Sequence, residues 1–199
     1  KKKKKRIDQR LAITKTIDFN EKARQKARKF LEEDLGFKDV KKRYIRIVKY
    51  ILWEECNRTC PYTGSPISAE SLFGPTPEFD IEHIIPLSRS LDNSFANKTL
   101  CHNRVNHIKG NKTPFEAFGE SGHKEEGVLE WDEMIDLVKK FNWKKKYRPR
   151  KTGPGSFTVE KVDDRYKLEI FQTKEAKFED FAHSQLNDTS YASREAVKY

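Results

Sequence analysis

The chain has 199 residues, with 41 Lys and Arg against 31 Asp and Glu, which gives a formal net charge of +10. Its length suits one ordinary domain or a small domain with appendages. Only 35% of its residues are hydrophobic, and no apolar run approaches the roughly 20 residues that cross a bilayer, which excludes a membrane protein. Three cysteines are too few for a disulfide scaffold and favour a reducing compartment. Because the chain does not begin with Met, we expect a fragment of a longer protein.

The N-terminal part is predicted to be basic and helical. Residues 1–30 contain thirteen Lys and Arg and three acids, a balance that phosphate neutralisation would use. A solvated helix face or a localisation signal has the same composition. Asn20 can cap a helix over residues 21–35 that Gly36 ends, and residues 39–56 repeat apolar side chains with helical spacing.

The central part is predicted to contain two strands followed by a helix. Residues 66–77, with three Pro and one Gly, indicate an irregular loop. Residues 79–82 alternate apolar and acidic side chains, which predicts a short strand, and residues 98–101 predict a second one. A polar helix over 103–109 follows, and Thr113-Pro-Phe-Glu116 is a capping box.

The C-terminal part gives weaker signals. Apolar spacing predicts a helix over residues 131–141, which leads into a second basic run at 139–151. Residues 157–171 alternate loosely around Asp163-Asp164, which favours a hairpin there. Residues 186–199 are predicted to be helical.

The first strand and the polar helix carry side chains suited to phosphodiester hydrolysis. A carboxylate from Glu82 and an amide oxygen from Asn106 are hard ligands that suit Mg²⁺ or Mn²⁺. The neutral imidazole of His83 can take a proton from water. Each residue also has a structural interpretation, in which His83 supports the strand, Asn97 and Asn106 cap turns or helices, and Asp80 with Glu82 forms a solvent face.

The joint spacing favours the functional interpretation. His83, Asn97 and Asn106 are 14 and 9 residues apart, and Lys-Gly-Asn follows the last. This pattern resembles the HNH, or ββα-metal, nuclease motif in its His-Asn-Asn variant. The resemblance implies an α+β fold that is mostly α-helical, with a ββα-metal (HNH/His-Me finger) centre and flanking helices.

The resemblance also implies a role for each motif residue. His83 would be the general base, Asn97 would fix the loop between the strands by hydrogen bonds, and Asn106 would ligate the metal. The residue before the catalytic His is a metal ligand in this family, which assigns that role to Glu82, although many members carry Asp there. Asp80 would not bind the metal itself but would help to orient the residues that do.

The cysteines distinguish branches of this family. Many HNH enzymes hold a structural zinc with two Cys-x-x-Cys pairs, and the matching places here hold Cys60 with Thr63 and His102 with Val105. Thr63 and Val105 cannot replace thiolates, so we expect no structural zinc and buried free thiols instead. The alternative is an improvised site made of the three cysteines and His102.

Longer stretches narrow the resemblance. These stretches are CPYTGSPI at 60–67, DIEHIIPLS at 80–88 and DNSFANKTL at 92–100. They resemble the HNH domain of type II CRISPR RNA-guided DNA endonucleases, and QLNDTSY at 185–191 resembles the point where those enzymes re-enter a split RuvC domain. The implied organisation is a basic helical linker from the RuvC side at 1–43, the HNH domain at 44–143, a basic linker with a hairpin at 144–184 and the RuvC re-entry at 185–199.

The resemblance implies a metal-dependent endonuclease module that hydrolyses the guide-RNA-paired (target) DNA strand with one Mg²⁺, or Mn²⁺ in its place. Its partners would be the DNA target strand, the guide RNA–DNA heteroduplex and the RuvC and other domains of the same parent chain, with no membrane, in a bacterial or archaeal cytoplasm. The side chains expected to contact phosphates are Lys98, Arg104, Lys109 and Lys112. The alternatives are a free-standing HNH endonuclease of the homing or restriction type and a non-catalytic basic nucleic-acid-binding module.

Overall fold

The computed structural model describes residues 2–38, 43–119, 125–143, 145–153, 156–163 and 166–175. These residues form two compact units, one within 1–57 and 142–165 and the other within 58–141 and 166–199. Helices dominate and the strands come in two antiparallel pairs, so the predicted α+β class is confirmed. Within the described ranges, no helix is long and apolar enough to cross a membrane. The helix predicted at 186–199 lies outside these ranges.

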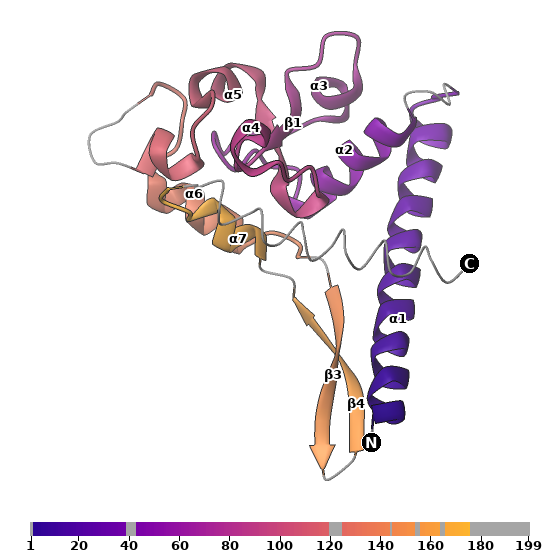
Figure 1. Cartoon of the computed structure of the whole chain (residues 1–199). Helices are drawn as coiled ribbons and strands as arrows, with labels where there is room; N and C mark the ends of the chain where they lie inside the picture. The colour runs from indigo at the N-terminus through magenta and orange to yellow at the C-terminus, as the bar shows by residue number, and fades with distance from the viewer. Residues whose placement is uncertain are drawn as a thin grey trace. The chain divides into compact units, whose positions relative to one another are not determined.

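The first unit combines long helices with a hairpin. Its elements are α1 (Lys2–Lys29), the π-helical turn η1 (Phe30–Asp34), α2 (Arg43–Glu55), β3 (Lys145–Gly153) and β4 (Ser156–Asp163). The two strands pair from Lys145 opposite Asp163 to Gly153 opposite Ser156, and α1 runs beside the hairpin (Figure 1). The helix expected from residue 21 begins at Lys2 instead, because the preceding segment holds good helix formers and no Gly or Pro.

Aromatic rings hold this unit together where α1 ends. The Phe30 ring lies 5.0 Å from that of Tyr50 and 5.7 Å from that of Trp53. Lys26 and Glu54 form an ion pair of 2.6 Å beside this cluster. Gly36 then takes a positive φ of 67°, which stops the helix where the sequence predicts.

The hairpin position differs from the prediction. Asp163, expected in the turn, is instead the last residue of β4, and residues 166–171 form the helix α7 (Tyr166–Phe171). In α7, Lys167 is buried together with Ile170 and Phe171, which lie three and four residues later, as on one face of a helix. Short apolar runs fit strand and helix almost equally well, so their spacing could not settle the assignment.

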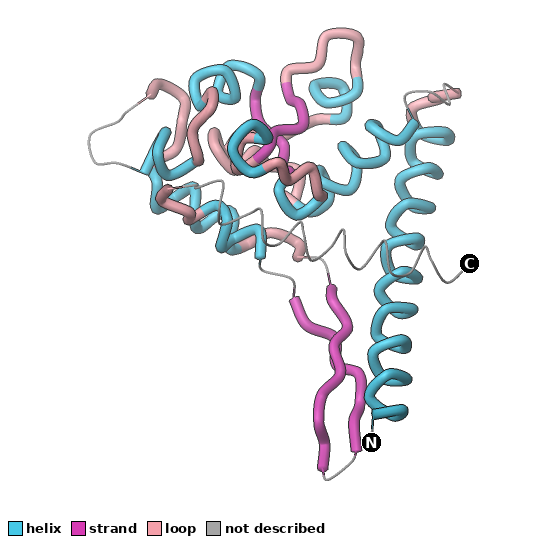
Figure 2. The backbone as a smooth tube through the Cα atoms, in the orientation of Figure 1, coloured by secondary structure: helices cyan, strands magenta, loops and turns pink. Residues whose placement is uncertain are grey.

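The second unit surrounds a small sheet. Its elements are α3 (Ala69–Phe73), β1 (Phe79–His83), α4 (Leu87–Ser90), η2 (Phe95–Asn97), β2 (Lys98–His102), α5 (Asn103–Lys109), η3 (Phe115–Gly119), α6 (Trp131–Lys139) and α7. The strands drawn in magenta among these helices in Figure 2 are β1 and β2, paired antiparallel from Phe79 opposite His102 to His83 opposite Lys98. Both strands, α5 and α6 were predicted and are confirmed. The loop expected at 66–77 contains α3, because Ser68 caps it by accepting a hydrogen bond from the Ser71 backbone.

The core of this unit fixes the strand–loop–strand–helix segment. Helix α5 follows β2 directly and contacts both strands, and Leu100 and Val105 are fully buried between them. The Tyr62 ring packs against Phe118 at 5.9 Å and Phe171 at 5.4 Å. The segment that carries the predicted motif therefore rests on a rigid apolar base.

Candidate active site

Glu82 is buried at the end of β1. Its side chain is enclosed in the unit, with the residue only 2% exposed. The Tyr62 hydroxyl donates a hydrogen bond of 2.9 Å to Oε2. The Lys109 ammonium lies 2.6 Å from Oε1 and is held there by charge rather than by a well-directed hydrogen bond. We call Tyr62, Glu82 and Lys109 the buried triad.

Within the buried triad, the Lys109 ammonium balances the charge of the Glu82 carboxylate, and the Tyr62 phenol is neutral. Burial and the adjacent Glu82 charge raise the pKa of Tyr62 well above its usual value, so the phenol stays neutral and donates. Lys109 also donates to the His83 carbonyl at 3.1 Å. In this structure the Lys109 ammonium is not offered to a phosphate, because the residue is only 2% exposed and its charge is paired with Glu82. The predicted phosphate contact of Lys109 stays a prediction.

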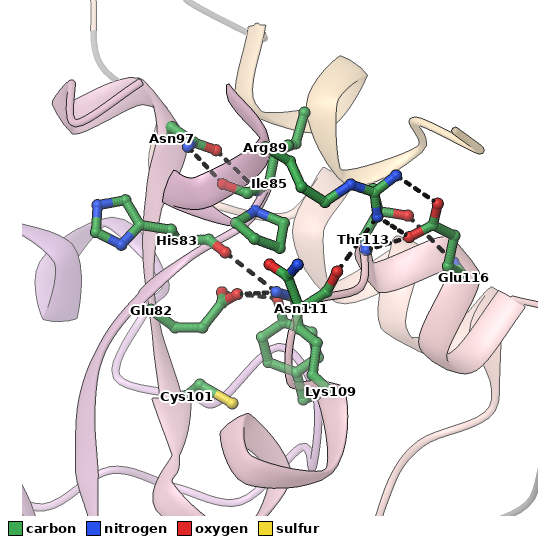
Figure 3. A network of polar contacts seen from close by, with 12 residues as sticks. Glu82, His83, Ile85, Arg89, Asn97, Cys101, Lys109, Asn111, Thr113 and Glu116 are labelled. Atoms are coloured by element: carbon green, nitrogen blue, oxygen red, sulfur yellow. Dashed lines mark hydrogen bonds and ion pairs between the residues drawn. The ribbon is translucent and has the colours of Figure 1, made fainter. Parts of the chain in front are cut away.

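The imidazole of His83 points the opposite way from the Glu82 carboxylate (Figure 3). Successive side chains of a strand alternate between its two sides, so neighbours in sequence face apart. The ring is half-buried, and its Nε2 lies 3.0 Å from Oδ1 of Asn93. His83 is thus accessible to water, as a general base must be.

Asn97 ties together the loop between the strands. Its amide nitrogen donates to the carbonyls of Ile85 at 2.8 Å and Asp92 at 2.9 Å, and its oxygen accepts from the Ile85 backbone at 2.9 Å. The residue is 1% exposed. One buried side chain therefore bridges the beginning and the end of the loop that follows His83 (Figure 3).

A second polar contact joins this loop to the segment after α5. The Arg89 guanidinium forms a bidentate pair with Glu116, at 2.5 and 2.9 Å. Glu116 also accepts from the Thr113 backbone at 2.8 Å, and Thr113 Oγ1 accepts from that of Glu116 at 3.1 Å, which confirms the predicted capping box. Arg89 lowers the pKa of Glu116 by its hydrogen bond, so the pair is ionised at neutral pH.

The other predicted acidic and amide residues lie at the edges of this arrangement. Asp80 is exposed, and its carboxylate accepts a hydrogen bond of 2.7 Å from the Ile81 backbone. Asn106 is half-buried on α5, one helical turn before Lys109. The structure therefore brings Glu82 beside Lys109, while His83 faces away from that pair and Asp80 is exposed near the start of β1.

The other side chains predicted to contact phosphates differ in their exposure and in the hydrogen bonds that they already make. Lys98 is partly buried, which lowers the pKa of its ammonium, and it donates to the Asn93 carbonyl at 2.7 Å. Arg104 is exposed and donates to the Glu126 carbonyl. Lys112 is exposed on the turn after α5. Lys112 and Arg104 are consequently the better placed of the four to meet a ligand at the surface.

All three cysteines are buried and free. A hydrogen bond from the Cys101 thiol, with further donors from Thr63 and the backbone, lowers the pKa of Cys60 to about 6. Burial raises the pKa of Cys101. The two thiols therefore behave as a donor and an acceptor inside the unit.

The predicted metal ligands fit a divalent cation by their chemistry, but a lysine ammonium already lies beside one of them. Glu82 and Asn106 supply the hard oxygens that Mg²⁺ prefers. In the described part of the chain, no group of three or more His, Cys, Asp and Glu side chains gathers as a metal site would. Both Glu82 oxygens already have partners, and the cation beside Oε1 is an ammonium.

The chain is similar to proteins of known family and structure. Residues 60–115 match the HNH endonuclease family. The CRISPR-associated endonuclease Cas9 1 of Streptococcus thermophilus is 41% identical over 69 residues, which are 35% of this chain and 6% of that protein. The CRISPR-associated endonuclease Cas9 of Campylobacter jejuni is 37% identical over 116 residues, 58% of this chain and 11% of that protein. A crystal structure of Streptococcus thermophilus Cas9 in complex with AGGA PAM superposes with a TM-score of 0.63 at 25% identity, covering 96% of this chain and 17% of that one.

The chain therefore contains an HNH endonuclease domain. Its similarity to bacterial Cas9 proteins agrees with the predicted origin in a type II CRISPR endonuclease. The matched residues span only 6% and 11% of the length of these two curated relatives.

Sequence reasoning missed Tyr62, Asn93 and the Arg89–Glu116 pair. Tyr62 lies in a turn and Asn93 in the irregular loop between the strands, where no periodic pattern reveals which way a side chain points. Lys109 lies three residues after Asn106 and so on the same side of α5, but this spacing does not reveal its ion pair with Glu82.

Proposed function

We propose that the segment from Glu82 to Asn106 hydrolyses a phosphodiester bond of one DNA strand, with His83 as the general base. The observation that carries the proposal is the accessible His83 ring at the end of β1, inside the stretch that matches the HNH family. Asn97 supports it by holding the loop through three hydrogen bonds shorter than 3.0 Å.

The proposed step is a direct attack by water. His83 takes one proton from a water molecule, whose oxygen forms a bond to the phosphorus in line with the leaving 3′ oxygen. The bond from phosphorus to that oxygen then breaks, which leaves a 5′ phosphate and a 3′ hydroxyl after protonation. The product is one cut strand.

The identity and position of the metal belong to the proposal too. HNH nucleases generally depend on a divalent metal. One Mg²⁺, with Mn²⁺ as substitute, between Glu82 and Asn106 stays a prediction, because it requires Lys109 to leave Glu82. Calorimetric titration with Mn²⁺ tests it: the parent chain should bind one ion and Asn106→Ala should bind it more weakly. Equal affinity in both would remove Asn106 from the site.

We further propose that this domain acts inside a larger CRISPR effector in the cytoplasm, where it cuts the DNA strand paired to guide RNA. The names of its relatives and the DNA-bound state of the solved neighbour support this. RuvC and the other domains of the parent chain would present the heteroduplex. Arg104, Lys112 and Lys98 would contact its phosphates.

A cleavage assay separates the alternatives. The chain is given Mg²⁺ and either a DNA strand paired to RNA or plain duplex DNA. Cutting of the RNA-paired strand supports the proposal, equal cutting of plain duplex supports a free-standing HNH nuclease, and binding without cutting supports a non-catalytic module.

The role of His83 is tested in the same assay. Removing a general base lowers the rate by about 10²–10⁴, so His83→Ala should lose nearly all cleavage. The matched control is His107→Ala, which removes an exposed histidine of α5 and should cut at the parent rate. Parent-like cleavage by His83→Ala would refute the assignment.

A further inference from the structure

We propose that Asn93 is a positioning residue for His83, which fixes the tautomer of the imidazole so that Nδ1 is the nitrogen that takes the proton from water. This inference rests on the proposed role of His83. It begins from one contact on the open side of the site, where Oδ1 of Asn93 lies 3.0 Å from Nε2 of His83.

The chemistry of the two groups fixes the direction of this hydrogen bond. An amide oxygen only accepts, so Nε2 must carry the hydrogen. A neutral imidazole has one N–H, so the lone pair then belongs to Nδ1. Within the described residues, Nδ1 has no hydrogen-bond partner, so that nitrogen is free to meet water. The contact therefore selects which ring nitrogen can act as the base.

Asn93 can orient the ring because its own backbone is anchored on both sides. The Lys98 ammonium donates to its carbonyl at 2.7 Å. The preceding carbonyl, that of Asp92, accepts from the amide nitrogen of Asn97 at 2.9 Å. The Asp92 carboxylate accepts from the Ser94 backbone at 2.8 Å, which closes the turn.

This anchoring gives Asn97 an indirect route to the general base. Asn97 does not hydrogen-bond the His83 ring, but it holds the turn that presents Asn93. The order of contacts is then Asn97 to the Asp92 carbonyl, Asn93 as the next residue, and finally the imidazole. The buried side chain of Asn97 thus determines where the exposed side chain of Asn93 lies.

The tautomer can be measured without DNA, metal or cleavage. The parent chain is labelled with ¹⁵N, and long-range ¹H–¹⁵N correlation of the neutral His83 ring shows which nitrogen carries the hydrogen. We expect the Nε2–H form to dominate in the parent. Asn93→Ala should lose this bias, whereas Asn93→Asp, which keeps an accepting oxygen, should retain it.

The matched control is Asn103→Ala. Asn103 is exposed like Asn93, and its side chain makes a hydrogen bond too, in this case to the Pro77 backbone carbonyl at 2.8 Å. Its removal should leave the His83 signals unchanged. A parent ring dominated by Nδ1–H would overturn the inference without any variant, and so would an unchanged tautomer in Asn93→Ala.

Cleavage kinetics give the second readout. A neutral hydrogen bond of this kind corresponds to up to about a tenfold change in rate. Asn93→Ala should therefore lower kcat by about tenfold with KM unchanged, and Asn93→Asp should restore most of it. An unchanged kcat in Asn93→Ala would overturn the catalytic part of the inference. If the parent itself does not cleave, the proposed function fails while the tautomer result stands, so the two failures are distinguishable.

Discussion

The two sides of strand β1 differ in what holds them and in what they offer to a ligand. On the inner side, Glu82 is enclosed by Tyr62 and Lys109 and is sealed from water. On the outer side, His83 is open and bonded to an exposed Asn93. Adjacent residues of one strand therefore have separate tasks. Removing a partner of Glu82 should therefore act first on stability, and changes at His83 should act on chemistry.

The largest stability effect is expected from Lys109→Met. The substitution keeps much of the side-chain volume but leaves the Glu82 carboxylate buried without a cation, which destabilises a protein by about 3–5 kcal/mol. Urea denaturation of the variant and the parent measures the change. Lys112→Met is the control, because Lys112 is exposed and should lose less than about 0.5 kcal/mol. An equal loss of unfolding free energy in both variants would show that the ion pair with Glu82 does not stabilise the inner side of β1.

Asn97→Ala should have the next largest effect. It removes the bonds donated to the Ile85 and Asp92 carbonyls and the one accepted from the Ile85 backbone, and it leaves those polar backbone atoms without this partner. An unsatisfied buried group costs about 1–3 kcal/mol. Hydrogen exchange of the Ile85 amide should also accelerate. Retained protection at Ile85 would show that another contact holds the loop.

A smaller effect is expected from Arg89→Gln. The Arg89 and Glu116 side chains are 24% and 22% exposed, and a partly exposed bidentate pair contributes about 1 kcal/mol. Because the pKa of Glu116 is lowered in the folded state, the stabilisation is present at neutral pH and is lost as the pH falls below 4.5. Thermal unfolding across pH 3 to 7 should therefore be less acid-sensitive in the variant. An identical pH dependence in both proteins would exclude a contribution from the pair.

The smallest stability effect is expected from His83→Ala. The ring is half-buried and its hydrogen bond to Asn93 is with an exposed amide, so the unfolding free energy should change by less than about 0.5 kcal/mol. Urea denaturation of the variant that has lost cleavage checks this. A loss comparable to that of Lys109→Met would mean that the ring is structural.

Local signals predicted the core of the fold well. Alternation predicted β1, Gly110 and polar spacing predicted α5, and the capping box at Thr113 and Glu116 is formed as expected. These features depend on residues within a few positions of one another. The short helix α3 was missed, although Ser68 is a suitable cap, because three Pro and a Gly dominate that stretch.

Contacts between residues far apart in the sequence could not be predicted from local patterns. Lys109 reaches a carboxylate 27 positions earlier, and a lysine beside a glycine gives no sign that its ammonium will be enclosed. The expectation of a surface contact followed from charge alone, which holds for most lysines but not for one paired inside. The same limit applies to Asn93, whose contact with His83 depends on how Asn97 folds the intervening loop.

The side-chain length of Glu82 has a consequence for exchanging residues between relatives. An aspartate at this position would be shorter by one carbon–carbon bond, about 1.5 Å. Its oxygens would then stop short of both the phenol of Tyr62 and the ammonium of Lys109, which now lie within 3 Å. A graft of the aspartate that other family members carry therefore calls for compensating changes at the two partner positions, so these three residues should be transplanted together.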